Sequence, residues 1–183
     1  MKPPYLWLTR AQAHSIVALA RQMPDQEVCG FIVGRGQQAL EVIPIGNIAP
    51  NPQQRFIMEP QQQIQALMRL QREKLEVLAI FHSHPTTEPL PSLVDVAEFA
   101  YPDALCLIVS LQHAQARFAA WAIQGLSVNP VPLYLQDSMP EPEVNRSTAR
   151  RTVPLVVWLA AIIAVMSLIG ASIALLPPAP VIP

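Results

Sequence analysis

The segment from Pro154 to Leu176 is the feature that most limits what this chain can fold into, because it runs for 23 residues without a charged side chain. As an α-helix it would be about 35 Å long, enough to cross the roughly 30 Å hydrocarbon core of a bilayer. Its apolar residues surround the helix, whereas a core helix is usually shorter and keeps a polar face. The segment predicts one transmembrane helix over 154–176, with a buried core helix as the alternative.

The flanks of this segment predict its orientation. Arg146, Arg150 and Arg151 precede it and no charge follows it, so the positive-inside rule places the N-terminal bulk in the cytoplasm. The proline-containing, mixed-charge stretch 137–153 is predicted to be a flexible linker, and 177–183 a short tail. The first residues carry no signal-peptide pattern. We therefore expect a single-pass membrane protein with a cytoplasmic domain over 1–136.

Composition excludes some function classes. The 183 residues include 12 Lys and Arg against 13 Asp and Glu, a net charge of −1, which argues against a nucleic-acid partner. Two cysteines cannot build a disulfide framework, so a reducing compartment suits the chain. Neither observation indicates an oligomeric state.

Residues 1–136 alternate strand and helix patterns, which predicts an α/β (α+β) domain with a mixed central sheet flanked by helices. About six strands and two or three helices are expected. Strand patterns occur at 5–9, 28–34, 39–45, 56–58, 75–82, 104–111, 116–123 and 133–135, more segments than the expected sheet needs. Helices are predicted over 9–22, from Pro60 and from Ser92. In the second helix Ile64, Leu67 and Met68 keep helical spacing, so its glutamines are predicted to be solvated.

The candidate chemistry lies at the end of the most apolar predicted strand. His82 and His84 are two residues apart, so both imidazoles would point to the same face of the strand. A proline-containing loop follows, and Asp95 stands one turn into the next predicted helix. Two histidines and a carboxylate that leave one position open are typical of a catalytic zinc site.

Simpler interpretations exist for each of these residues. A histidine on a strand is usually an ordinary core or surface residue. Ser92 and Asp95 also fit a capping-box pattern, in which a serine N-cap is followed three residues later by a carboxylate. The adjacent His-Ser-His-Pro sequence is what favours the metal site over capping alone.

The pattern His82-Ser83-His84-Pro85, followed by Ser92 and Asp95, resembles the JAMM (MPN-plus, JAB1/MPN/Mov34) zinc metallopeptidases. The segment from Glu27 to Gly30 resembles the Glu-x-x-Gly segment of that family. The similarity extends over about residues 5–125 and is closest to the compact bacterial and archaeal type. It implies the JAB/MPN fold, which is similar to that of cytidine deaminases.

The resemblance also implies a role for each matching residue. His82, His84 and Asp95 would bind Zn²⁺, and Glu27 would be the general base of hydrolysis. Ser92 would help to stabilise the oxyanion. The simpler alternative for Glu27 is a solvated carboxylate in a loop.

Other residues with reactive side chains are weaker candidates. Cys29 and Cys106 lie in apolar strand patterns and are predicted to be buried apolar residues rather than nucleophiles or ligands. His14 and His113 lack metal-ligand spacing.

The resemblance implies a substrate class. Compact members of the family are linked to ubiquitin-like and sulfur-carrier proteins, so we expect hydrolysis of an amide or isopeptide bond after the C-terminal tail of such a protein. Two alternatives stay open. One is a membrane-tethered module that binds ubiquitin-like proteins with little or no activity. The other is a RadC-like protein, because Pro91-Ser92 also fits the pattern of that family.

Overall fold

The computed structural model describes residues 5–140. The predicted transmembrane helix, the predicted tail and the predicted linker after Pro140 lie outside these residues. Within residues 5–140, no helix combines the length and the apolarity needed to cross a membrane.

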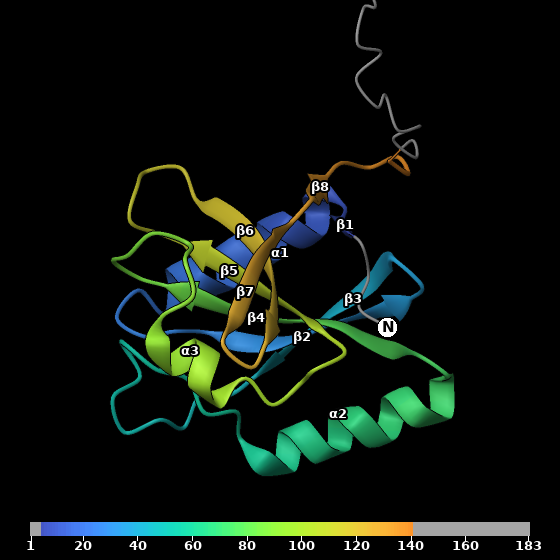
Figure 1. Ribbon diagram of the computed structural model, residues 1–183, viewed down its shortest axis with the longest axis horizontal. Helices are drawn as coiled ribbons and strands as arrows, with labels where there is room; N and C mark the ends of the chain where they lie inside the picture. The colour runs from blue at the N-terminus through green and yellow to red at the C-terminus, as the bar shows by residue number, and fades with distance from the viewer. Residues whose placement is uncertain (1–4, 141–183) are drawn as a thin grey trace, which may run out of the picture. The chain divides into compact units, whose positions relative to one another are not determined.

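The described residues fold around one mixed sheet in the order β7-β6-β5-β4-β2-β3-β1-β8 (Figure 1). β4 is parallel to β5 and antiparallel to β2, which places it in the middle of the sheet. The strands are β1 (Leu6–Leu8), β2 (Cys29–Arg35), β3 (Gln38–Ile45), β4 (Glu76–His84), β5 (Leu105–Ser110), β6 (Arg117–Gln124), β7 (Ser127–Val131) and β8 (Leu133–Leu135).

Three helices accompany the sheet, and side chains cap the start of each. α1 (Arg10–Gln22) begins with a capping box between Thr9 and Gln12. α2 (Pro60–Glu73) has proline at its first position and Glu59 as N-cap. α3 (Leu93–Glu98) begins at Ser92. These starts agree with the positions predicted from the sequence.

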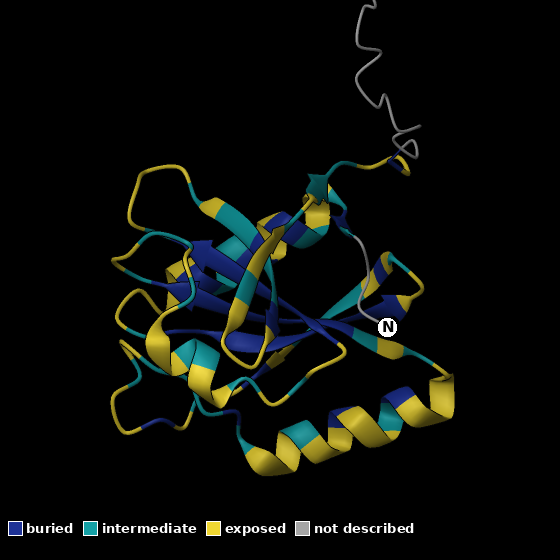
Figure 2. Ribbon diagram, in the orientation of Figure 1, coloured by how far each residue is buried: buried dark blue, intermediate teal, exposed yellow. Residues whose placement is uncertain are grey.

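The two faces of the sheet are covered by different helices. Ile16 and Ala20 of α1 pack in one cluster with Ile32 and Phe81. Residues of α2 pack with Phe31 and Ile80 on the opposite face. A third apolar cluster joins α3 to residues of β5 and β6. Figure 2 shows the central strands buried between these layers. The predicted mixed sheet flanked by helices is confirmed.

Three details of the prediction were wrong. Phe56–Met58 is not a strand, and only an isolated bridge joins Met58 to Asn47. The sheet has eight strands rather than about six, and β7 was not predicted because Pro130 interrupts its pattern. In α2 most of the glutamines are exposed, as predicted, but the apolar spacing indicated the wrong face: the buried residues are Ala66 and Leu70, whereas Ile64 and Met68 are 56% and 60% exposed.

Candidate functional site

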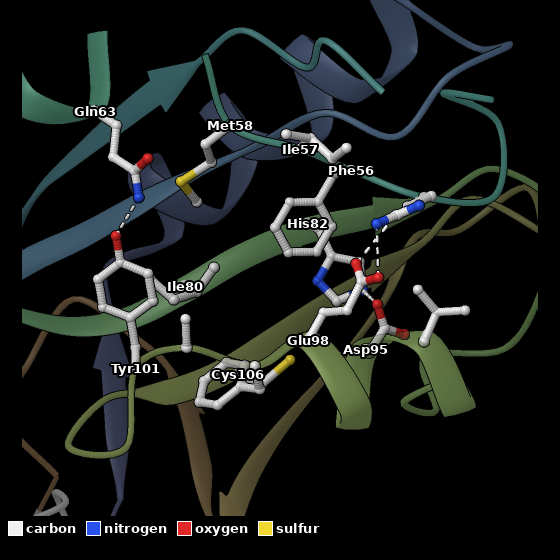
Figure 3. Close-up of a pocket in the computed structure, with 14 residues that line it drawn as sticks. Phe56, Ile57, Met58, Gln63, Ile80, His82, Asp95, Glu98, Tyr101 and Cys106 are labelled. Carbon is white, nitrogen blue, oxygen red and sulfur yellow. Dashed lines mark hydrogen bonds and ion pairs between the residues drawn. The ribbon is translucent and has the colours of Figure 1, made fainter. Parts of the chain in front are cut away.

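His82 and His84 lie at the end of β4, which is buried along most of its length. Strand alternation places both on the face that carries Ile80, and their Nε2 atoms lie 3.1 Å apart. The ring of Phe56 stacks on His82 at 4.7 Å between centroids (Figure 3). Both imidazoles are buried, so each is fixed in a narrow space with its Nε2 atom directed at the other.

Asp95 completes this cluster from α3. Its Oδ1 atom lies 3.4 Å from His82 Nε2 and its Oδ2 atom 3.6 Å from His84 Nε2. Burial alone would raise the pKa of the Asp95 carboxyl, but interactions with the two imidazoles outweigh burial and hold that pKa well below its usual range. Asp95 is therefore an ionised carboxylate between two histidines.

The predicted capping box at Ser92 is also present. The backbone N–H of Ser92 donates to Asp95 Oδ2 at 2.7 Å, and the backbone N–H of Asp95 donates to Ser92 Oγ at 3.1 Å. These bonds orient the Asp95 carboxylate, so capping and site assembly use the same two residues. The Ser92 hydroxyl acts as an acceptor here and keeps its own proton for donation.

The loop after β4 fixes the orientation of one histidine. His84 Nδ1 lies 2.9 Å from the carbonyl oxygen of Glu88 and 3.0 Å from Thr87 Oγ1. Because a carbonyl oxygen only accepts, Nδ1 carries the proton and Nε2 presents its lone pair to the cluster. His82 Nδ1, by contrast, is buried without a hydrogen-bond partner.

Glu27, the general base that the resemblance implies, is buried in the structure. It is 5% exposed, and its Oε2 atom has no hydrogen-bond partner. Burial raises the pKa of Glu27 to about 8; the electrostatic interaction with His84, which acts only when that imidazole is protonated, opposes this shift, and the interaction with Asp95 adds to it. The solvated-loop alternative is therefore wrong for Glu27, whose carboxyl is desolvated and acts electrostatically on the site.

The backbone around Glu27 is held from three directions. The Glu27 N–H donates to the carbonyl oxygen of Pro52 at 2.6 Å, and its carbonyl accepts from Asn47 Nδ2 at 2.9 Å. The N–H of Val28 donates to Ser83 Oγ at 2.9 Å. Ser83 lies between the two histidines of β4, so the same strand that carries the imidazoles also positions the glutamate.

Gly30 explains the end of the Glu-x-x-Gly segment. A Cβ atom at this position would lie 2.2 Å from the carbonyl oxygen of Ile43 and 2.7 Å from the Phe81 ring. Only glycine lets β2 approach its neighbours this closely.

The three ligand candidates suit a metal ion chemically. One ligand atom from each of His82, His84 and Asp95 lies within 4.8 Å of the other two. Two imidazole nitrogens and one carboxylate oxygen form the donor set of an open catalytic zinc site, because a fourth position is left for a water molecule or substrate. His84 already has the tautomer that such binding needs.

The weaker candidates lie elsewhere or are inert. Cys29 and Cys106 are buried, as predicted, and burial raises the pKa of the Cys29 thiol to about 12. His14 lies on the exposed side of α1. His113 pairs with Glu88 at 3.0 Å, outside the metal cluster.

Sequence reasoning missed the residues that support the site. Asn47 and Ser83 hold the Glu27 segment, and Phe56 covers His82. Trp121 donates its indole N–H to the carbonyl oxygen of Pro89 at 2.9 Å, next to the carbonyl that His84 uses. Asn47 precedes a proline-rich loop, which is a weak signal of a side chain that bonds to backbone. Nothing in the sequence indicated the role of Trp121.

The chain is similar in sequence to known proteins. A family model described as prokaryotic homologs of the JAB domain matches residues 9–124. A desampylase from Pyrococcus furiosus is 35% identical over 97 residues, which is 53% of this chain and 66% of that protein. A probable TtuB-protein conjugate cleaving protease from Thermus thermophilus is 38% identical over 91 residues, 50% of this chain and 57% of that protein.

A solved structure shows the same fold. The solution structure of a protein from Desulfitobacterium hafniense aligns with a TM-score of 0.66 and 29% identity, over 73% of this chain and 94% of that one. The match to the curated relatives spans less than two thirds of their length. The family model covers more than half of this chain, and the chain therefore belongs to the prokaryotic homologs of the JAB domain.

Proposed function

We propose that this protein is a zinc-dependent isopeptidase that hydrolyses the amide or isopeptide bond after the C-terminal tail of a ubiquitin-like or sulfur-carrier protein. The observation that carries the proposal is the convergence of His82, His84 and Asp95, together with the buried carboxylate of Glu27, whose Oε2 atom has no hydrogen-bond partner. The names of the two relatives support the reaction class, since both describe removal of such a conjugate.

His82, His84 and Asp95 would hold the zinc ion. When bound there, zinc supplies Lewis acidity that lowers the pKa of a water molecule and polarises a carbonyl group. The Glu88 carbonyl keeps the proton of His84 on Nδ1, so its Nε2 stays available as a ligand. The capping box keeps the Asp95 carboxylate turned toward both imidazoles.

Glu27 would move the proton. As general base it accepts a proton at its carboxylate from the attacking water and delivers that proton to the departing amine. The buried position suits this transfer, because burial raises the pKa of Glu27 into the range where a carboxyl both takes up and releases a proton near neutral pH. The Ser92 hydroxyl would donate a hydrogen bond to the oxyanion that forms at the scissile carbonyl.

Cleavage of a defined conjugate tests the proposal. The substrate is a β-grasp protein with a Gly-Gly tail joined through an isopeptide bond to a lysine peptide, and the enzyme is the full chain with stoichiometric zinc. We expect the wild-type protein to release the peptide. Glu27→Gln should keep its zinc but lose at least about 100-fold in rate, the scale of general-base catalysis. Wild-type-like turnover in Glu27→Gln would contradict the mechanism.

We also propose that residues 154–176 anchor the protein in a membrane, with the catalytic domain on the cytoplasmic side. The support is the uncharged apolar length of this segment and the arginines that precede it. We expect the full chain to remain in the membrane pellet after alkaline carbonate extraction, and a chain ending at Val153 to be released. Release of the full chain by carbonate would overturn the anchor.

A further inference from the structure

A cavity of about 220 Å³ adjoins the proposed metal site and has no part in the mechanism above. His82 and Asp95 line one end of it, and Figure 3 shows it continuing along Ile80 toward Tyr101. The loop before α2 and the segment after α3 form its two sides. A group bound there would therefore lie next to the reacting bond.

The walls of the cavity are mostly apolar. Aliphatic, aromatic and sulfur-containing side chains line it, among them Phe56, Met58, Ile80, Val94 and Phe99. A cavity with such walls takes up an uncharged apolar group, because a charged group would lose its hydration without gaining a partner.

The polar groups around the cavity already have partners. Arg55 donates to both carboxylate oxygens of Glu98, at 2.6 and 3.0 Å. At the far end, the Gln63 amide donates to the Tyr101 hydroxyl. Each charge at the rim is thus neutralised by its neighbour, and the cavity offers no free charge to attract an ionic side chain.

The position of Glu27 decides which side of the scissile bond lies over the cavity. The departing amine must come within hydrogen-bonding reach of the Glu27 carboxyl that protonates it. Glu27 and His84 do not line the cavity, which is reached from the side of His82 and Asp95. A cavity that Glu27 does not line suits the acyl side of the bond, along the tail of the modifier, better than the acceptor side.

We propose that this cavity binds one bulky apolar side chain of the modifier tail, located within a few residues before the terminal Gly-Gly, and thereby selects which modifier is cleaved. This inference rests on the proposed isopeptidase function. Arg55 and Glu98 join the two sides at the rim through an exposed ion pair. Both side chains of this pair are nearly half exposed, so they can turn toward the solvent as a side chain enters.

The test is a leucine scan of the tail. The probes are acetylated hexapeptides that end in Gly-Gly, with serine elsewhere and one leucine placed in turn at each of the four preceding positions. Each is made as a coumarin amide for cleavage and as a free acid for binding. For the wild-type protein we expect one leucine position to lower KM or Kd by about tenfold or more relative to the all-serine peptide. Equal values at all four positions would overturn the proposal.

A pair of matched variants locates the effect. Ala100 lines the exposed rim of the cavity, whereas Ala97 is exposed in the adjoining helix α3 and does not line it. Ala100→Trp should fill the rim and remove the leucine preference, and Ala97→Trp should keep the preference at its wild-type size. An undiminished preference in Ala100→Trp would contradict the assignment of the cavity.

Cleavage of the coumarin amides and binding of the free acids together distinguish a failure of the cavity assignment from a failure of the isopeptidase proposal. If no coumarin amide is cleaved but one leucine acid binds about tenfold more tightly than the all-serine acid, the cavity assignment stands and the isopeptidase proposal fails. If all amides are cleaved at equal efficiency, the isopeptidase proposal stands and the cavity assignment fails. Neither result depends on folding of a variant, because both use the wild-type protein.

Discussion

The Nδ1 atom of His84 lies 2.9 Å from the carbonyl oxygen of Glu88, so the loop that follows β4 sets the tautomer of a proposed metal ligand. The carbonyls on either side of that oxygen are also held. Ser110 Oγ donates to the Thr87 carbonyl at 2.6 Å, and the Trp121 indole donates to the Pro89 carbonyl at 2.9 Å. β5 and β6 thus fix the two carbonyls that flank the Glu88 carbonyl, and the Glu88 carbonyl orients His84.

Removing the Trp121 indole N–H should therefore weaken zinc binding. In Trp121→Phe we expect the zinc Kd, measured by chelator competition, to rise about threefold to tenfold. This is less than the roughly 10- to 100-fold loss typical when the direct partner of a liganding histidine is removed, because Trp121 acts through the loop.

Trp7→Phe is the matched control for this prediction. Trp7 also donates its indole N–H to a backbone carbonyl, that of Gln136 at 2.7 Å, but it lies on β1, three strands away from β4 in the sheet. Its zinc Kd should equal that of the wild-type protein. Equal zinc affinities in the two tryptophan variants would show that the loop does not position His84.

Binding of one zinc ion per chain should require each of the three ligand residues. Metal analysis of the purified full chain is expected to give about one zinc per chain, since the site holds three protein ligands and an open position. His82→Ala and Asp95→Ala should each lose it. His14→Ala, which removes an exposed histidine from α1, should retain it. A wild-type protein that fails to bind added zinc would refute the metal site.

The convergence of His82, His84 and Asp95 could be predicted from the sequence because its signals are local. Strand alternation alone brings His82 and His84 to one face, and a capping box alone orients Asp95 toward them. Glu27 was found only through a resemblance, since it lies two residues before β2, and β2 reaches β4 by long-range strand pairing. Periodicity contains no information on such pairing.

The fold was predicted less well where tertiary contacts override the local pattern. β7 contains Pro130 and pairs only with β6 among the described strands, so its pattern resembles a loop. In α2 the small Ala66 faces the sheet, whereas the larger Met68 faces away from it. Close packing of α2 against the sheet favours a small side chain at position 66. The helical spacing of the large apolar residues does not indicate this preference.

Asn47 should be required to hold the Glu27 segment. Its amide donates to the carbonyls of Glu27 and Arg55, and its side-chain oxygen accepts from two backbone N–H groups, all within 3.0 Å. In Asn47→Ala we expect the free energy of unfolding, measured by urea titration, to fall by about 1–3 kcal/mol, because these backbone groups lose their partner.

The exposed Asn51 provides the comparison for Asn47. Its amide makes one side-chain hydrogen bond, to Gln54 at 3.4 Å. Asn51→Ala should change the free energy of unfolding by less than about 0.5 kcal/mol, as surface substitutions usually do. If Asn47→Ala were as stable as Asn51→Ala, the four hydrogen bonds would have no net role in holding the loop.

Burial of Glu27 should make the stability of the metal-free protein depend on pH. The pKa of Glu27 is raised from its ordinary 4.5 in the unfolded chain to about 8 in the folded protein. Between these values the folded state binds the proton more tightly than the unfolded state, so the contribution of Glu27 to the free energy of unfolding falls as pH rises. Above about pH 8 both states are ionised and the contribution stays constant.

Glu27→Gln removes this titration and isolates its effect. In urea titrations with EDTA, we expect the variant to gain stability relative to wild type between pH 5 and pH 8, on the order of a few kcal/mol at the upper end. Glu76→Gln, at an exposed position in β4, controls for the loss of one charge and should show no comparable gain. A constant difference between Glu27→Gln and wild type over this range would mean that the Glu27 carboxyl titrates alike in the folded and unfolded chains, and burial would then not be what prepares it for proton transfer.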